Sequence, residues 1–334
     1  MKPTYVLTDD ESDELHGVLG DIDKDPYQDH DAFAQAVDDL LDRGDVPKFF
    51  LDVCAEIRAE REAGMSDVHV LRNCPIDAEL PELGNEDPVA RKHELKRTFI
   101  GEALLELFNR LMGTPLLAYA RNWGDFFTDV IAIDKYSGML TGYSDSELYF
   151  HNDRTAHEVR ADWISLLGMR CPQDDLIYTG FIHGEELLKH LDAEEQRLLR
   201  ESYFITPFDV FSKDKNKSLT DSGRHPILEN DHSFRYLDTS TRTAPDSPVA
   251  ARDALIAMKN AMAKAEKKRH RILERDLLVL ANQDGLHSRE KIDVQDAQSA
   301  RKRWLLKTYA FRDDAAADQH AAKWLAGVRG RVAD

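Results

Sequence analysis

Two histidines and one carboxylate stand where they could bind a metal ion together. His151 and Asp153 follow the alternating segment 147–150, and His287 comes more than 130 residues later in a second strand-like segment. A strand repeats every two residues, so His151 and Asp153 lie on the same face of theirs. Two imidazoles and one carboxylate form the facial ligand set of non-haem iron(II) sites. We therefore predict His151, Asp153 and His287 as metal ligands and as the catalytic centre.

Strands must position these side chains, and several segments have the composition of strands. Residues 163–169 and 277–282 are nearly continuous apolar runs, and shorter strand patterns cover 68–74, 176–181 and 301–311. Apolar runs of this length, separated by turn formers, are typical of buried strands. The sequence therefore predicts a β core that carries the three ligands.

Helical patterns flank this core. Residues 1–65 form an acidic region with apolar residues at helical spacing, and further helices are expected at 184–201 and 249–271. Residues 314–334 are rich in alanine and predict a C-terminal helix. The polar, broken segment 212–250 is long for a loop, and such loops are commonly lids or binding loops.

Composition and charge limit the class of protein. The chain has 334 residues and a formal charge of −18, which disfavours nucleic acid and anionic membranes as partners. Its three cysteines are scattered, which predicts neither a disulfide framework nor a zinc-thiolate site and suits the cytoplasm. No signal peptide and no membrane span are expected.

The order of these motifs resembles the clavaminate synthase-like branch of the iron(II)/2-oxoglutarate dioxygenases, in the taurine dioxygenase superfamily. This branch includes hydroxylases of free amino acids. The resemblance covers about residues 68–313 and is patchy between 212 and 249. Its three segments are 147–153 with Arg160, Asp162 and Trp163 behind it, 278–282 leading to His287-Ser288-Arg289, and Arg303-Trp304-Leu305.

The resemblance implies Fe(II) as the metal and 2-oxoglutarate and O2 as co-substrates, with succinate and CO2 as products. Asp153 stands where this branch commonly has Glu; the side chain is one methylene shorter but keeps its charge. A carboxylate at this position argues against a halogenase, in which halide needs the coordination site that the carboxylate fills.

The co-substrate carboxylate needs a basic anchor, and two arginines compete for this role. By resemblance the anchor is the Arg before Trp-Leu, Arg303, because a second basic residue, Lys307, follows four positions later where the family binds the substrate carboxylate. Arg301 instead restores the family's usual spacing from His287. Strand alternation would place Arg301 and Arg303 on the same face, so the pattern leaves both open.

Two further residues have roles by resemblance. Thr179 lies at a distance after His151 that suggests a hydroxyl contact to 2-oxoglutarate. Asp238 falls where relatives place acidic residues against a basic substrate side chain, although Ser240 stands where a second acid is common.

The sequence thus predicts one dioxygenase domain over 1–334, of the α+β class: an all-β double-stranded β-helix, or jelly roll, over 66–313, flanked by helices. The expected reaction is hydroxylation of an unactivated C–H bond in a free amino acid or a small amine-bearing derivative. Desaturation or cyclisation by the same chemistry remains an alternative, as do a jelly-roll binding protein without catalysis and an acidic helical scaffold. The oligomeric state is not predicted.

Overall fold

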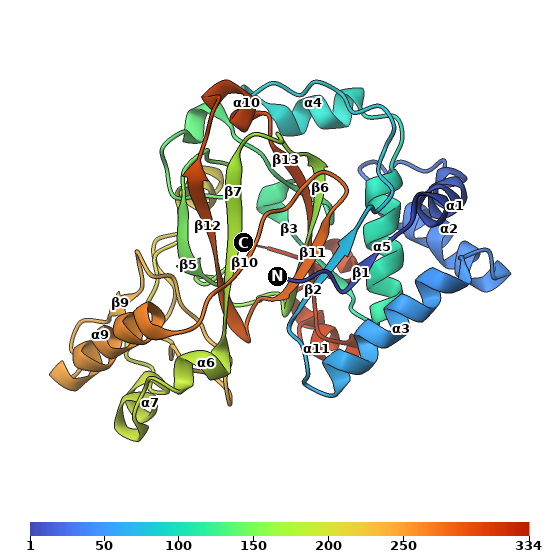
Figure 1. Ribbon diagram of the computed structural model, residues 1–334. Coiled ribbons are helices and arrows are strands. Elements are labelled where there is room, and N and C mark those ends of the chain that lie inside the picture. Colours follow the sequence, from blue (N-terminus) through green and yellow to red (C-terminus); the bar gives the residue numbers. More distant parts are fainter. Residues whose placement is uncertain (334) are drawn as a thin grey trace.

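Two β-sheets form the centre of the computed structural model, which describes residues 1–333 (Figure 1). The larger sheet contains β1 (Tyr5–Val6), β2 (Val68–Arg72), β3 (Leu116–Tyr119), β4 (Thr128–Val130), β6 (Trp163–Arg170), β11 (Leu277–Ala281), β13 (Trp304–Ala310) and β14 (Arg331–Val332). Its order is β1-β2-β11-β6-β13-β3-β14, and β4 also pairs with β13. The smaller sheet has the order β10-β7-β12-β5, formed by β5 (Leu148–His151), β7 (Leu176–His183), β10 (Lys268–His270) and β12 (Gly285–Asp293). A separate pair joins β8 (Phe204–Ile205) to β9 (Arg242–Thr243).

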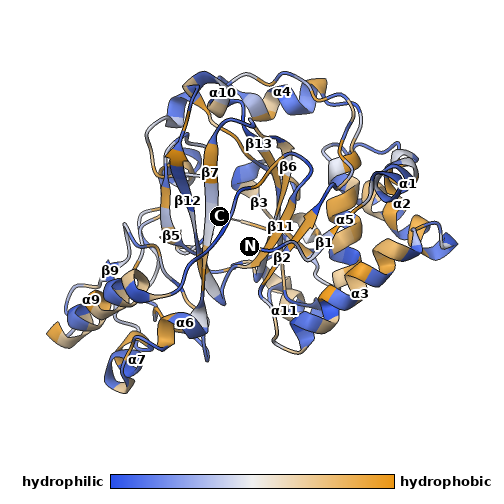
Figure 2. Cartoon of the chain, in the orientation of Figure 1, coloured by the Kyte–Doolittle hydropathy of each residue, from blue (hydrophilic) through white to orange (hydrophobic). Residues whose placement is uncertain are grey.

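The larger sheet is buried on both faces. In β11, Leu277 and Val279 belong to the apolar cluster that includes the N-terminal helices, whereas Leu278 and Leu280 belong to a cluster that reaches Phe181 of the smaller sheet. Side chains alternate along a strand, so burial of both faces requires an uninterrupted apolar run. Figure 2 shows this: the strands of the larger sheet are mostly hydrophobic, while the helices carry hydrophobic and hydrophilic faces.

Helices cover the outside of the larger sheet and extend below the smaller one (Figure 1). They are α1 (Asp9–Gly20), α2 (His30–Arg43), α3 (Lys48–Glu62), α4 (Pro88–Leu95), α5 (Ile100–Met112), α6 (Gly184–Leu188), α7 (Ala193–Leu199), α8 (Val210–Lys215), α9 (Val249–Lys264), α10 (Ala297–Arg301) and α11 (Asp314–Asp318). Short 3-10 turns lie at Ala120–Asn122, Asp134–Tyr136, Ala321–Lys323 and Leu325–Gly327. The described helices include none that is long and apolar enough to cross a membrane.

Three expected helices are shorter than their sequence patterns. The pattern over 184–201 divides into α6 and α7, because Asp192 forms a capping box that starts a new helix. The basic end of 249–271 leaves the helix after Lys264, and Lys268–His270 pairs with β7 as β10. At the C-terminus the helix covers only Asp314–Asp318. Elsewhere the predicted strands and helices agree with the structure within a few residues, and the chain is of mixed α and β structure.

Candidate active site

The three predicted ligands converge at one end of the smaller sheet. His151 ends β5 and His287 lies in β12, and the two residues are directly paired between these antiparallel strands. Opposite residues in such a pair share a face, and here the imidazole centroids are 4.3 Å apart. Asp153 Oδ1 lies 3.2 Å from His151 Nε2 and 3.6 Å from His287 Nε2. One donor atom from each residue is within 4.8 Å of the other two, close enough to hold one ion.

The protonation of the three groups suits a metal. His151 Nδ1 lies 2.7 Å from the carbonyl oxygen of Tyr149, so Nδ1 carries the proton and leaves the Nε2 lone pair free. Burial and the neighbouring His151 lower the pKa of His287 to about 4, which keeps that imidazole neutral at pH 7. Burial opposes ionisation of Asp153, but Lys307 and the two histidines outweigh it and hold its pKa well below the usual range. Two imidazoles and one carboxylate match a divalent first-row transition metal.

The second oxygen of Asp153 is held from the opposite sheet. Lys307 Nζ of β13 lies 3.1 Å from Asp153 Oδ2, and the Tyr309 hydroxyl donates to the same oxygen at 2.8 Å. Lys307 also donates to the Tyr309 oxygen at 2.7 Å. Burial alone would lower the pKa of Lys307, but Asp153 and Tyr309 raise it above the ordinary value. The ammonium is therefore charged and engaged by the carboxylate, which turns Oδ1 toward the histidines.

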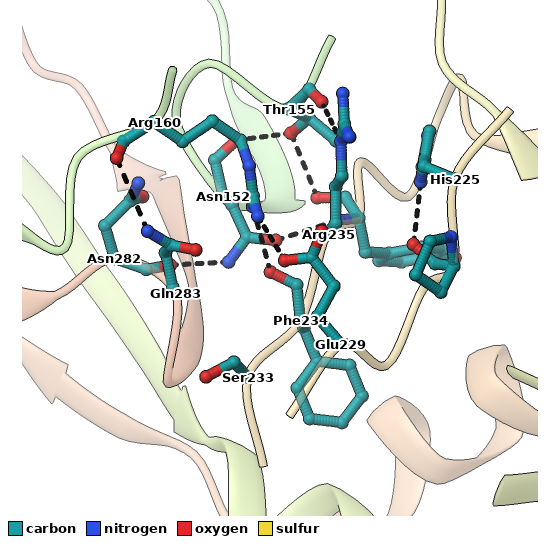
Figure 3. A network of polar contacts seen from close by, with 12 residues as sticks. Asn152, Thr155, Arg160, His225, Glu229, Ser233, Phe234, Arg235, Asn282 and Gln283 are labelled. Carbon is teal, nitrogen blue, oxygen red and sulfur yellow. Dashed lines mark hydrogen bonds and ion pairs between the residues drawn. The ribbon is translucent and has the colours of Figure 1, made fainter. Parts of the chain in front are cut away.

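Two buried asparagines, Asn152 and Asn282, fix the backbone around Asp153. Figure 3 shows both asparagines within a network of polar contacts. Asn282 accepts a hydrogen bond from the Asp153 amide at 2.8 Å and donates to the Asp153 carbonyl at 3.2 Å. Asn152 donates to the carbonyl of Gly285 at 2.8 Å and accepts from the Tyr236 amide at 2.8 Å. These bonds tie the segment that carries Asp153 to the turn between β11 and β12, which precedes His287. They set the separation of the ligands.

Replacing Asn282 with alanine is expected to lower the free energy of unfolding by about 3 kcal/mol, because it leaves buried backbone groups of Asp153 without partners. Metal affinity should fall at the same time by about 10-fold or more, since the carboxylate loses its fixed position. Urea denaturation and metal titration measure the two effects. Asn230→Ala is the matched control: Asn230 is exposed and should change stability by less than about 0.5 kcal/mol. Equal stability of the two variants would contradict this role.

A cavity of about 450 Å³ opens beside the ligands, between the two sheets. Alternate residues of β13 and the position before it line this cavity: Arg303, Leu305, Lys307 and Tyr309. The period of two places all four side chains on the same face. The segments 139–143 and 206–210 close the other sides.

The two rival arginines occupy different environments. Arg303 lines the cavity with only 9% of its surface exposed, and within residues 1–333 its guanidinium forms no hydrogen bond or ion pair. Burial lowers the pKa of Arg303. Arg301 ends α10 and binds the carboxylates of Asp134 and Asp145 on the outside. The expectation that both share a strand face is wrong, because Arg301 belongs to the helix α10, whereas Arg303 directly precedes the first residue of β13.

The other two predicted residues also differ in place. Thr179 is paired with Arg289 between β7 and β12 and lines the cavity. Asp238 is not among the cavity-lining residues: its Oδ1 accepts hydrogen bonds from the Tyr236 hydroxyl and from Lys259 Nζ, each at 2.7 Å. Lys259 projects from α9, so the acid at position 238 is balanced by the helix and does not face the cavity.

Sequence reasoning missed two residues beside the ligands. Tyr309 could have been found, because it follows Lys307 by two positions and must share its strand face. Arg154, directly after Asp153, also lines the cavity. No pattern marks it, since its place depends on an irregular backbone with φ of 64°.

Comparison with known proteins gives a match in structure but not in sequence. No family model matches the chain, and neither does any curated protein sequence. Asparagine oxygenase in complex with Fe(II), 2S,3S-3-hydroxyasparagine and succinate has a TM-score of 0.79 at 19% identity, covering 99% of each chain. The non-heme iron oxygenase OrfP in complex with Fe and alpha-ketoglutaric acid has a TM-score of 0.68 at 19% identity, covering 97% of this chain and 98% of that one. At this identity the likeness shows a shared fold.

Proposed function

We propose that this protein is an iron(II)/2-oxoglutarate-dependent dioxygenase that hydroxylates an unactivated C–H bond of a free amino acid or a small amine-bearing derivative. One observation carries the proposal: His151, Asp153 and His287 meet at the wall of a cavity that also contains the unpaired guanidinium of Arg303. Solved oxygenases with the same fold hold iron, alpha-ketoglutaric acid or hydroxylated amino acids, which supports this choice of chemistry.

The proposed architecture follows from the same similarity. We infer one dioxygenase domain over residues 1–334, with the two sheets as the halves of a double-stranded β-helix within 66–313. Residues 212–250 would act as a lid, since the cavity is lined by the segment just before them and by Leu237, Thr239 and Ser240 at their far end. The three cysteines are free and buried, which fits our proposal of a cytoplasmic location.

Each residue then has a task. His151, Asp153 and His287 would hold Fe(II) on one face and leave the other coordination positions to 2-oxoglutarate and O2. The bound metal would couple decarboxylation of 2-oxoglutarate to transfer of one oxygen atom from O2 to the C–H bond. Arg303 would bind the distal carboxylate of 2-oxoglutarate as a planar fork, with the Thr179 hydroxyl beside it.

The two residues expected to bind substrate receive different tasks. Lys307 is engaged by Asp153 and would position that ligand rather than clamp a substrate carboxylate. Asp238 would anchor the 237–240 segment to α9 through Lys259.

A direct assay tests the proposed function. We expect at least one standard amino acid or its amine derivative to stimulate succinate release when Fe(II), 2-oxoglutarate and O2 are all present. A product heavier by one oxygen atom identifies hydroxylation, whereas loss of two hydrogens identifies desaturation or cyclisation. Metal bound in stoichiometric amount without succinate release from any compound would instead support a binding protein.

A further inference from the structure

Arg154 has a backbone conformation that an arginine adopts only at a cost. Its φ of 64° lies in the left-handed region, where glycine or asparagine is strongly preferred. Bulky residues held there are concentrated at functional sites, because the surrounding structure must keep them in place. The chain has an arginine at this position immediately after the ligand Asp153.

The Arg154 side chain is buried without an anion. Only 8% of its surface is exposed, and Nε and Nη1 have no hydrogen-bond partner. Its guanidinium carbon lies 4.2 Å from the ring centre of Tyr119 and 5.1 Å from that of Tyr309. No carboxylate of residues 1–333 forms an ion pair with it. Aromatic faces stabilise the cation but leave its hydrogen-bond donors unused.

Two more unpaired polar atoms belong to residues that line the cavity. His157 Nδ1 and Asn122 Oδ1 are buried without partners, and both residues line the cavity with Arg154. Burial and Arg154 hold the pKa of His157 well below its usual range, so the imidazole is neutral and competes for no anion. Buried polar groups in native proteins rarely lack a partner, so water or a ligand in the cavity completes these groups.

The other cations of the cavity wall have tasks already. Lys307 is bound to Asp153, and Arg121 is paired with Asp209. Arg289 donates its hydrogen bonds to the carbonyl oxygens of Ser144 and Ser146. Arg303 is six residues before Tyr309, a separation of about 20 Å along an extended strand. The Arg154 guanidinium lies beside Tyr309, so Arg303 and Arg154 are at different ends of the cavity wall. One co-substrate carboxylate at Arg303 therefore leaves the guanidinium of Arg154 unsatisfied.

We propose that Arg154, held between Tyr119 and Tyr309, is the subsite for the carboxylate of the organic substrate. A planar guanidinium matches a carboxylate in two parallel hydrogen bonds and recovers the cost of its own burial. This inference rests on the proposed function and narrows it: the substrate is an acid with a free carboxylate, and carboxamides, esters and carrier-bound acyl groups are excluded. Lys307 stands where the family binds the substrate carboxylate, but here it is paired with Asp153 and does not bind the substrate.

Equilibrium binding tests the subsite without turnover. The standard L-amino acids are titrated anaerobically into the Fe(II)- and 2-oxoglutarate-loaded protein by calorimetry, and each binder is compared with its own carboxamide. We expect the acid to bind at least about 30-fold more tightly than the amide, the usual effect of removing one partner of a buried charge pair. Binding of no amino acid, or equal binding of acid and amide, overturns the proposal.

Variants at position 154 separate charge from folding. Arg154→Asn and Arg154→Gly both suit the positive φ, and both should reduce the preference for acid over amide to about one while 2-oxoglutarate binds as before. Arg154→Lys should keep part of the preference. Arg58→Gln, on the exposed face of α3, removes one charge elsewhere and should keep all of it. A preserved acid preference in Arg154→Asn contradicts the subsite.

The two proposals fail in different ways. If the protein prefers acids over amides but never releases succinate, the carboxylate subsite stands and the dioxygenase proposal fails. If acids and amides stimulate succinate release equally, the dioxygenase stands and the subsite fails.

Discussion

Replacing Asp153 with alanine is expected to abolish succinate release and to weaken iron binding by more than about 100-fold. The substitution removes the anionic ligand and leaves only the two imidazoles. It also frees the Lys307 ammonium, which lies 3.1 Å from Asp153 Oδ2 and would then repel a divalent cation. Iron titration and an assay of succinate release, with the substrate found in the amino-acid screen, measure the two effects.

The same substitution should lower the stability of the metal-free protein by about 3 kcal/mol, because the Lys307 ammonium is left in a largely buried position without its carboxylate. Adding Lys307→Met removes the orphaned charge. The double variant is therefore expected to regain stability in urea denaturation while it still releases no succinate. This separates the ligand role of Asp153 from its part in the ion pair.

Two comparisons complete this experiment. Asp153→Glu keeps the charge and ligand type and should retain iron binding and part of the turnover. His232→Ala removes a histidine from the other group of potential metal ligands, Asp67, His183 and His232, and should leave succinate release intact. Turnover that survives Asp153→Ala or His287→Ala would show that the metal site is assigned to the wrong residues.

Replacing Arg303 with leucine is expected to raise the dissociation constant of 2-oxoglutarate by about 100-fold, because the distal carboxylate loses a buried bidentate partner. Thr179→Val should have a smaller effect, about 10-fold, since it removes one hydrogen bond to a charged group. Binding is measured anaerobically with the metal-loaded protein, so turnover is not needed.

Arg301→Leu is the matched control, because Arg301 binds Asp134 and Asp145 outside the cavity. It should change 2-oxoglutarate binding by less than about threefold, the scale of a surface ion pair. Stability adds an independent readout. Without 2-oxoglutarate, Arg303→Leu should be at least as stable as the parent protein, because it removes an unpaired buried charge. An inverted result, with weak binding in Arg301→Leu alone, would assign the co-substrate to Arg301.

Local periodicity predicted much of the core. The apolar runs at 163–169 and 277–282 became β6 and β11, which are buried on both faces of the larger sheet. Alternation along a strand predicted that His151 and Asp153 would lie together. In the structure β5 ends at His151, and Asp153 follows in a turn that brings its carboxylate to 3.2 Å from His151. His287 lies opposite His151. The resemblance to oxygenases agrees with the fold found in the structural comparison. These predictions depend only on neighbours in sequence and on the composition of each strand.

Where one element ends and the next begins was harder to predict. The sequence pattern predicts that a strand starts at Arg301. In the structure Asp296 instead caps a short helix that ends at Arg301. That single boundary turns Arg301 outward and leaves Arg303 in the cavity. The same kind of boundary divided the 184–201 helix at Asp192. Capping hydrogen bonds of about 1 kcal/mol decide such positions, and apolar periodicity does not report them.

By itself, the sequence determined the three candidate ligands, the strands that carry them and the basic residues near the start of β13. Only the tertiary structure decided that Lys307 neutralises Asp153, that Asp238 is held by Lys259, and that Arg154 is left without an anion. Each of these facts joins or separates charges on segments far apart in the chain. Whether such charges pair depends on which groups the folded chain brings together, and no local sequence pattern predicts the distance between them.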